Sequence, residues 1–189
     1  MTTKQILEYA CLFLGKEELL NSAYFINEGE QLTEENTKDL NLLKRCLDLV
    51  ISEIASDYMP IIKSKEIEFE NFACQISSID NSIQEIISIK SKTGKNLFYK
   101  IVDNKIICKT NLADVEYKVY PSKSELNGDC ENFGGRIPDR VIAYGVCMEY
   151  CLVSLLFDDA QIWENRYKSS LLINSRKKSE MKLKKRRFI

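Results

Sequence analysis

Histidine is absent from this chain of 189 residues, and its absence excludes most of the familiar catalytic constellations. A Ser-His-Asp triad, a Cys-His dyad, an HExxH zinc site and histidine acid-base catalysis each require an imidazole. The chain also has no Walker-type phosphate loop, and no GxGxxG follows a strand. We therefore expect no catalytic residue, no nucleotide-driven reaction and no cofactor, and we expect that the protein is not an enzyme.

The seven cysteines are the remaining residues that could hold a metal. Cys147 and Cys151 are four residues apart and would share one face of a helix, but no second close pair completes a tetrahedral site. Free cysteine is among the most frequently buried residue types. We interpret both as small core residues, predict no metal site, and expect reduced thiols in a cytoplasmic protein, because nothing resembles a secretion signal.

The acidic pair Asp158 and Asp159 and the single residue Glu149 are interpreted differently. Asp158 and Asp159 are predicted to cap a helix and to interact with its dipole. Glu149 lies within the otherwise apolar run Val141 to Phe157, where an unpaired carboxylate would cost several kcal/mol, on the order of the desolvation of isolated ions. We predict that Glu149 is a structural buried charge, either paired with an arginine or exposed at a subunit interface. The candidate arginines are Arg45, Arg140 and Arg166.

Opposite charges divide the chain between its body and its end. The chain has 27 Lys plus Arg and 28 Asp plus Glu. The last fourteen residues hold eight of the basic residues and one of the acidic residues, so the rest of the chain holds 19 basic and 27 acidic residues. Apolar side chains are interleaved with these charges, so we predict an arm that docks to a protein partner. The alternatives are binding to nucleic acid, to anionic lipid or to a neighbouring copy, and a solvated terminus without a partner. The predicted partner-binding residues are Arg176, Lys177, Lys178, Met181, Lys182, Leu183, Lys184, Lys185, Arg186, Arg187, Phe188 and Ile189.

Helical periodicity occupies both ends of the body. Thr2 and Gln5 have capping-box spacing before an amphipathic helix that ends at Gly15, and Thr33 is placed to cap a second helix that closes near Tyr58. After Pro138, Val141 to Phe157 is apolar almost all round, which is typical of the central helix of a bundle. Its central Glu149 argues against a membrane span. A final amphipathic helix is predicted to start near Asp158 and to pack on the preceding apolar helix as a hairpin.

Between these ends, the hydrophobic period changes from helical to two. Short antiparallel strands are predicted at residues 67–69, 83–89, 97–102, 106–108 and 115–119. Asp103-Asn104 has the length of a two-residue hairpin turn, and Lys92 to Asn96 supplies another turn. A polar stretch from Pro121 to Ile137 is longer than the usual connection, and we interpret it as either a functional loop or a mobile one.

The predicted fold class is therefore α+β: a bundle of about four helices with a small antiparallel β insertion and an extended C-terminal arm. Its parts are expected at residues 1–64 for the N-terminal helices, 65–120 for the β insertion, 121–137 for the linker, 138–178 for the C-terminal hairpin and 179–189 for the basic arm.

The two ends of the chain resemble the head-to-tail adaptor proteins of tailed bacteriophages, of the connector or tail tubular type. The resemblance covers TTKQILEYACLFLGKEELL near the start and the run from RIPDRVIAYG to KKRRFI at the end, about half of the chain. It implies a structural virion protein that is made in the bacterial host cytoplasm. Many copies, commonly twelve, would form a ring at the head-tail interface, with DNA passing through the lumen as cargo.

The same resemblance implies specific partners. The expectation that no membrane is involved rests on Glu149 and not on the resemblance. The C-terminal arm would grip the portal protein, and the β insertion would face the next tail component or the neighbouring subunit. The alternative is a nucleic-acid-binding accessory protein that uses the basic C-terminal tail on phosphate.

Overall fold

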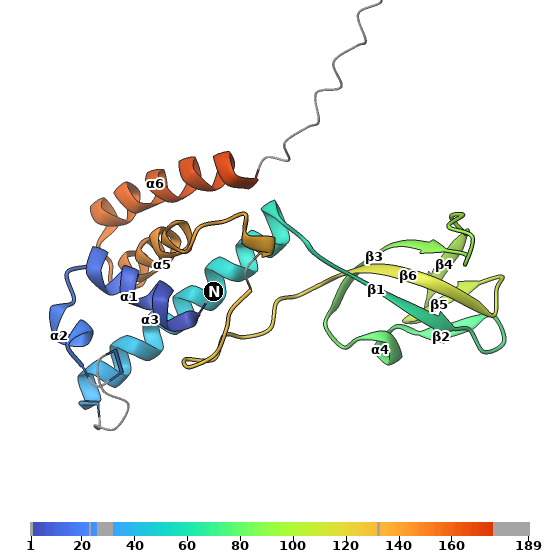
Figure 1. Cartoon of the computed structure of the whole chain (residues 1–189), viewed down its shortest axis with the longest axis horizontal. Helices are drawn as coiled ribbons and strands as arrows, with labels where there is room; N and C mark the ends of the chain where they lie inside the picture. The colour runs from blue at the N-terminus through green and yellow to red at the C-terminus, as the bar shows by residue number, and fades with distance from the viewer. Residues whose placement is uncertain (1, 23, 26–31, 132, 176–189) are drawn as a thin grey trace, which may run out of the picture.

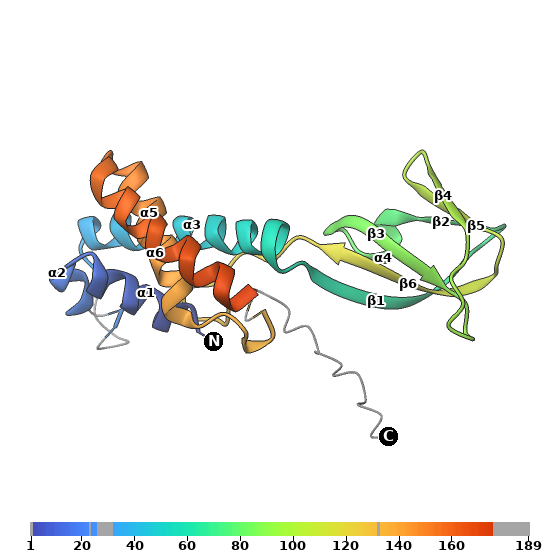
Figure 2. The same ribbon diagram turned by 90° about the horizontal axis from the view of Figure 1, so that it is seen from above.

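The structure consists of a helical lobe and a β lobe placed end to end. It is a computed structural model and describes residues 2–22, 24–25, 32–131 and 133–175. The β lobe continues beyond the end of the longest helix, so the molecule is elongated (Figures 1 and 2). The predicted α+β class is confirmed.

The helical lobe contains both ends of the described chain, and it is formed by α1 (Thr3–Phe13), α2 (Glu17–Leu20), α3 (Glu34–Glu53) with a π turn (Ile54–Tyr58), α5 (Asp139–Val153) and α6 (Phe157–Ser175). The predicted capping box is present, because the Thr2 side chain accepts from the Gln5 amide and the Gln5 side chain accepts from the Thr2 amide. Thr33 caps α3 through the Asn36 amide, as predicted. The short helix α2 was not predicted.

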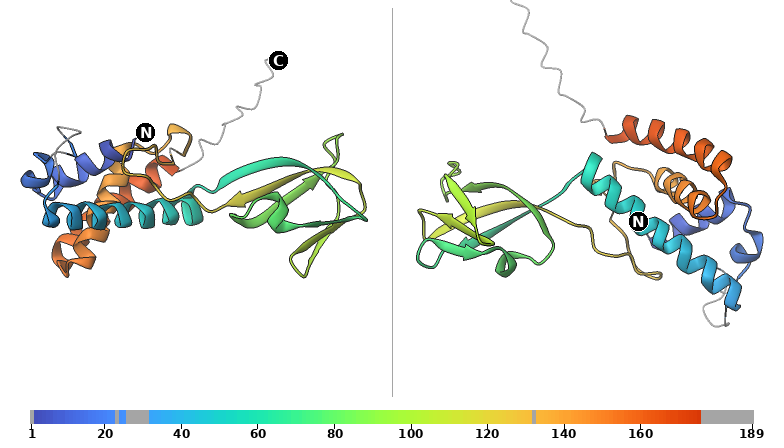
Figure 3. Two further views of the ribbon diagram at one scale, coloured as in Figure 1. Left: turned by 90° about the horizontal axis from the view of Figure 1, so that it is seen from below. Right: turned by 180° about the vertical axis from the view of Figure 1, so that it is seen from behind.

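Helix α5 is the central helix of the bundle, as its apolar sequence predicted. It packs against α1, α3 and α6 (Figure 3). Gly145 permits a close approach to α3 and α6: a Cβ at this position would lie 2.8 Å from Val50 Cγ1 and 3.0 Å from Tyr167 Cε2. The packing of α6 on α5 confirms the predicted hairpin.

One predicted helix is shorter than expected. The run Val141 to Phe157 was expected to be a single helix, but α5 ends at Val153 and α6 begins at Phe157. The chain turns between them through Leu155, whose φ is +60°. The hydrophobic pattern did not reveal this end, because residues 151–157 are all apolar except Ser154.

The β lobe contains two three-stranded antiparallel sheets. Their strand orders are β1-β6-β3 and β2-β5-β4. The strands are β1 (Ile61–Glu68), β2 (Ala73–Gln75), β3 (Ile83–Lys90), β4 (Tyr99–Val102), β5 (Lys105–Cys108) and β6 (Leu112–Val119), and the short helix α4 (Ile76–Ile79) follows β2. The sequence did not predict β2 and α4, which are short. Strand β1 begins before the expected boundary at residue 65, because its first residue, Ile61, pairs with Val119 at the end of β6.

Both predicted turns of the β lobe are present. Asp103 and Asn104 join β4 to β5 with φ of +48° and +60°, and Val102 pairs with Lys105 directly across the turn. Such left-handed conformations at both central residues match the twist of a two-residue hairpin. In the second turn, the Ser91 amide donates to the Lys95 carbonyl at 2.9 Å.

The stretch from Pro121 to Ile137 is held against the helical lobe over its described residues. The Ser124 amide donates to Asp48 Oδ1 at 2.8 Å, and the Tyr24 hydroxyl donates to the Leu126 carbonyl. Phe133 and Ile137 are buried in the helical core. The described part of this long connection therefore contributes to the packing of the bundle.

The buried apolar side chains form two separate clusters. One fills the helical bundle, with Leu47, Ile142 and Tyr167 fully buried, and the other fills the β lobe, with Ile106 and Val115 fully buried. Each lobe therefore has its own hydrophobic core. The lobes are connected by β1 on one side and by the chain after β6 on the other (Figure 1).

Candidate functional site at the α5–α6 corner

The predicted docking arm, Arg176 to Ile189, lies outside the described residues. The described chain ends at Ser175, the last residue of α6. The structure therefore places Ser175, the residue before the arm, and the described surfaces of the bundle, but not the arm itself. The interpretation of its individual residues stays a prediction.

Glu149 lies on α5 and is half-buried, but its expected arginine partner is absent. Among the described residues, no ion pair or hydrogen bond joins it to Arg45, Arg140 or Arg166, and all three arginines are exposed. Burial raises the pKa of Glu149, and the nearby Glu53 carboxylate raises it further. The helical period shows which face a residue occupies, but which charges face it depends on how α3 and α6 pack.

The two cysteines of α5 are core residues, as interpreted from the sequence. Cys147 and Cys151 are both buried, and burial raises the pKa of each thiol. The Cys147 Sγ lies 3.7 Å from the Ala10 carbonyl oxygen of α1. Within the described residues, no group of three or more His, Cys, Asp or Glu side chains is arranged to hold a metal ion.

The predicted acidic cap residues lie one position further into α6 than expected. The helix begins at Phe157, so Asp158 and Asp159 occupy its first turn, where both are exposed. Carboxylates at this position interact favourably with the partial positive charge of a helix N-terminus. They also place negative charge directly beside a run of exposed apolar residues.

That apolar surface is the α5–α6 corner, which we define as residues 152–157. Five of its six side chains are large, apolar and exposed, and Leu155 is the most exposed at 72%. Contiguous exposed apolar side chains rimmed by charge are typical of protein interaction sites. The exposed members of the corner are Leu152, Val153, Leu155, Leu156 and Phe157.

The conformation of Leu155 is unusual for a leucine. Its amide donates to the Leu152 carbonyl, and the Leu156 amide donates to the Cys151 carbonyl, which together form a Schellman helix end. The residue at the left-handed position of this motif is usually glycine. A leucine at this position costs about 1–2 kcal/mol of backbone strain.

Helix α1 ends in the same motif with the usual residue. The Gly15 amide donates to the Leu12 carbonyl, the Lys16 amide donates to the Cys11 carbonyl, and Gly15 has φ of +65°. The chain thus contains two equivalent turns, one with glycine and one with an exposed, strained leucine. Strained residues that the fold retains are concentrated at functional positions.

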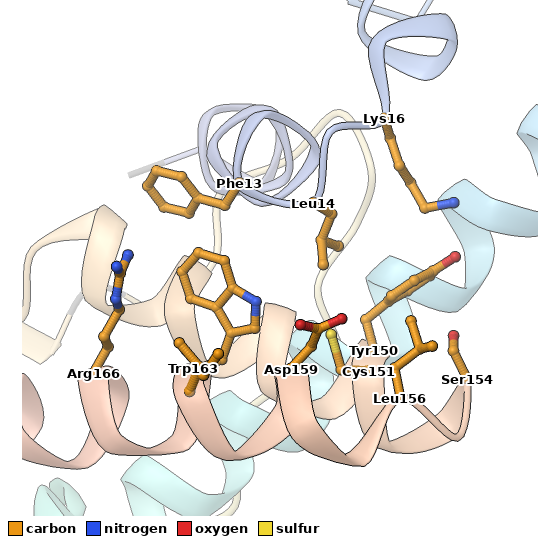
Figure 4. Close-up of a pocket in the computed structure, with 11 residues that line it drawn as sticks. Phe13, Leu14, Lys16, Tyr150, Cys151, Ser154, Leu156, Asp159, Trp163 and Arg166 are labelled. Atoms are coloured by element: carbon orange, nitrogen blue, oxygen red, sulfur yellow. The ribbon is translucent and has the colours of Figure 1, made fainter.

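A hollow of about 490 Å³ lies on one side of this corner, between α1 and the hairpin (Figure 4). Trp163 of α6 stacks on Phe13 of α1 at 5.6 Å between ring centroids, and Arg166 lies over the Trp163 ring at 5.1 Å. On the α5 side, Lys16 lies over the Tyr150 ring at 4.8 Å. Aromatic faces with cations above them are suited to contact with a polypeptide.

The thiol of Cys151 also lines this hollow, but its surroundings do not activate it. Burial raises the pKa of Cys151, and the Asp159 carboxylate raises it further. A raised pKa lowers the fraction of nucleophilic thiolate. The chemistry of this hollow therefore favours binding over reaction.

A second hollow of about 480 Å³ lies on the other side of α6, where α3 ends. The first turns of α6 therefore separate two hollows, and the exposed corner lies at the end of both. Sequence reasoning did not identify this combined surface. The run LVSLLF followed by DD was a signal for it, because its apolar residues exceed what one buried helix face can use.

No protein-family model matches the chain, and a search of curated proteins finds no match. Over the described residues, no helix combines the length and the apolar content needed to cross a membrane.

Proposed function

We propose that this chain is a structural subunit of the head-to-tail junction of a tailed bacteriophage. In this proposal, identical copies form a ring, the C-terminal arm of residues 176–189 docks to the portal protein, and the ring joins the portal to the tail. DNA passes through the lumen as cargo. The proposal rests on the resemblance of the two chain ends to adaptor proteins and on the surfaces described above.

The observation that carries the proposal is the exposed α5–α6 corner. A protein that acts alone in water gains nothing from a strained leucine with 72% of its surface exposed. A subunit that buries this leucine against a neighbour recovers the strain energy through apolar burial of about 25 cal/mol per Å². The corner is therefore suited to a contact between subunits.

The far lobe supports the same proposal. Strand β4 is an edge strand, and Phe98, Ile101 and Val102 are exposed on or beside it, with Phe98 at 82%. Exposed apolar edge strands are templates for association with another chain. Contact surfaces in both lobes of an elongated subunit are consistent with side-by-side packing in a ring.

The first test replaces Leu155 with glycine. Leu155→Gly removes both the strain and the exposed side chain, so we expect the isolated chain to gain about 1 kcal/mol of stability. We also expect it to form few or no rings, alone or with the portal protein encoded by the same genome. Thermal unfolding measures the first effect, and negative-stain electron microscopy measures the second.

Leu12→Ala is the matched control, because Leu12 is an exposed leucine on α1 with 62% exposure. It should leave ring formation unchanged. Wild-type chains that remain monomeric with and without portal protein would contradict the proposal. Salt-sensitive DNA binding that disappears when residues 176–189 are deleted, with portal binding unaffected, would favour the nucleic-acid alternative.

A further inference from the structure

The second hollow is a groove that both apolar and acidic side chains line. It lies where the end of α3 meets α5 and the first half of α6, and its volume is about 480 Å³. Three carboxylates face it from three different helices: Glu53 from α3, Glu149 from α5 and Glu164 from α6. The remaining lining residues are Met148, Leu152, Phe157, Ala160, Gln161 and Lys168.

Negative charge in this groove exceeds the positive charge that the described residues supply. Lys168 is the cation among the lining residues, and it is bound to Glu164 at 2.5 Å. Glu53 accepts a hydrogen bond from the Tyr167 hydroxyl at 3.2 Å, and Glu149 has no hydrogen-bond or ion-pair partner among the described residues. Burial raises the pKa of both Glu53 and Glu149. A cationic ligand would relieve the repulsion between them.

The chain itself contains a segment of matching chemistry. Residues 176–189 contain eight Lys or Arg and one Glu, with four apolar side chains among them. Grooves bind peptides through cations that pair with carboxylates and through apolar side chains that pack on apolar lining residues. The four apolar residues of this segment are Met181, Leu183, Phe188 and Ile189.

The position and length of the segment bring it within reach of the groove. It follows Ser175 directly, and the end of α6 lies at the same end of the bundle as the last turns of α3, which carry Glu53 (Figures 1 and 2). From Ser175 back to Phe157 the distance along α6 is about 27 Å at 1.5 Å per residue. Fourteen residues can extend to about 46 Å. The segment can therefore reverse direction and still reach the corner.

We infer that residues 176–189 fold back along α6 and dock in this groove of their own chain. In this inference, the cations of the segment lie opposite the three carboxylates of the groove, and its apolar side chains lie against the apolar lining residues. The same chain is favoured over a second copy, because a short tether gives an effective concentration in the millimolar range. This inference concerns the isolated chain and holds whichever partner an assembly binds.

Zero-length cross-linking tests the docking directly. A carbodiimide joins a lysine to a carboxylate only where the two are in contact, and peptide mass spectrometry identifies the pair. We expect links from lysines of residues 176–189 to Glu53, Glu149 or Glu164, with loss of these links at 1 M salt because screening weakens the attraction. An equal mixture of ¹⁴N and ¹⁵N chains should give isotopically unmixed links.

Two results would overturn the inference. Links of mixed isotope would assign the groove to the segment of a second copy, and links that avoid the three carboxylates would remove the groove as its site. Neither result bears on ring formation, which the Leu155→Gly experiment tests separately.

A variant of the groove gives an independent test in the full chain. Glu53→Gln, Glu149→Gln and Glu164→Gln together remove the three charges with little change in side-chain shape. We expect trypsin to cleave within residues 176–189 about five-fold faster or more in this variant, because the undocked population increases. Trp163 fluorescence confirms that the bundle remains folded.

The matched control removes the same number of charges from the β lobe, with Glu66→Gln, Glu68→Gln and Glu70→Gln. This control should be cleaved at the wild-type rate. Equal cleavage rates in all three proteins would show that the carboxylates of the groove do not hold the segment.

Discussion

Packing and backbone conformation constrain the identity of two residues in this protein, Gly145 and Leu155. Gly145 is the clearest example, since it lies where three helices meet and a Cβ there would overlap Val50 Cγ1. Leu155 is the opposite case, a large side chain in a conformation suited to glycine. At both positions the identity of the residue depends on a neighbour, which is Val50 for Gly145 and, in our proposal, an adjoining subunit for Leu155.

A substitution at Gly145 tests this packing. Gly145→Ala should gain about 1 kcal/mol in helix propensity but lose about 1–3 kcal/mol to overpacking, for a net loss near 1 kcal/mol. Urea unfolding monitored by Trp163 fluorescence measures the change. Val50→Ala removes the methyl group that the new Cβ would overlap. The double variant Gly145→Ala with Val50→Ala should therefore lose less stability than the two single variants lose together, by about 0.5 kcal/mol or more. Simple additivity would show that the contact with Val50 is not limiting.

At the scale of elements, the helix ends and turns follow local chemistry. Side-chain caps begin α1 and α3, a Schellman motif ends α1 and α5, and a two-residue turn joins β4 to β5. Each of these features depends on residues within about six positions of one another. They differ in how well the residue present suits the conformation it adopts.

In the turn between β4 and β5, two substitutions of Asn104 should change the stability of the β lobe in opposite directions. Asn104 has φ of +60°. Asn104→Gly should stabilise the β lobe by about 0.5 kcal/mol, because glycine is the preferred residue at this position of the turn. Asn104→Ala should destabilise it by about 1 kcal/mol, because a Cβ is disfavoured at positive φ. Amide hydrogen exchange in β4 and β5 measures both effects. Equal protection in the two variants would contradict the left-handed turn.

At the scale of the whole molecule, two cores are joined by two extended connections. The fully buried residues of one lobe do not form a common cluster with those of the other. The charges are also divided, since an acidic body precedes a cationic segment of fourteen residues. The molecule is therefore elongated, with two separate cores and an uneven distribution of charge along the chain. In our proposal, this separation suits an adaptor between two larger assemblies.

Two separate cores should respond separately to mutation. Ile106→Ala should lower the free energy of unfolding of the β lobe by about 2–5 kcal/mol. The stability of the helical lobe, measured by Trp163 fluorescence, should change by no more than about 0.5 kcal/mol. Leu47→Ala should have the converse effect. Trp163 is the single tryptophan, so its fluorescence in urea isolates the helical lobe, and hydrogen exchange of β5 and β6 reports the other. One shared transition that both variants shift equally would contradict this division.

The sequence by itself determined the features that local interactions decide. The caps at Thr2 and Thr33, the turn at Asp103-Asn104, the central position of α5 and the α+β class all follow from spacing within a few residues. The sequence also determined that an acidic body carries a basic segment. The sequence predicts these features because the groups that form hydrogen bonds or pack together in them are close together in the chain.

Only the tertiary structure decided which distant groups meet. It left the corner after α5 exposed, and it placed Glu53 beside Glu149 in place of an arginine. It also bound the long connection after Pro121 to the bundle through Asp48. The physical reason is common to all three: each depends on packing between segments that are far apart in the sequence, and no local pattern records which faces of those segments come together.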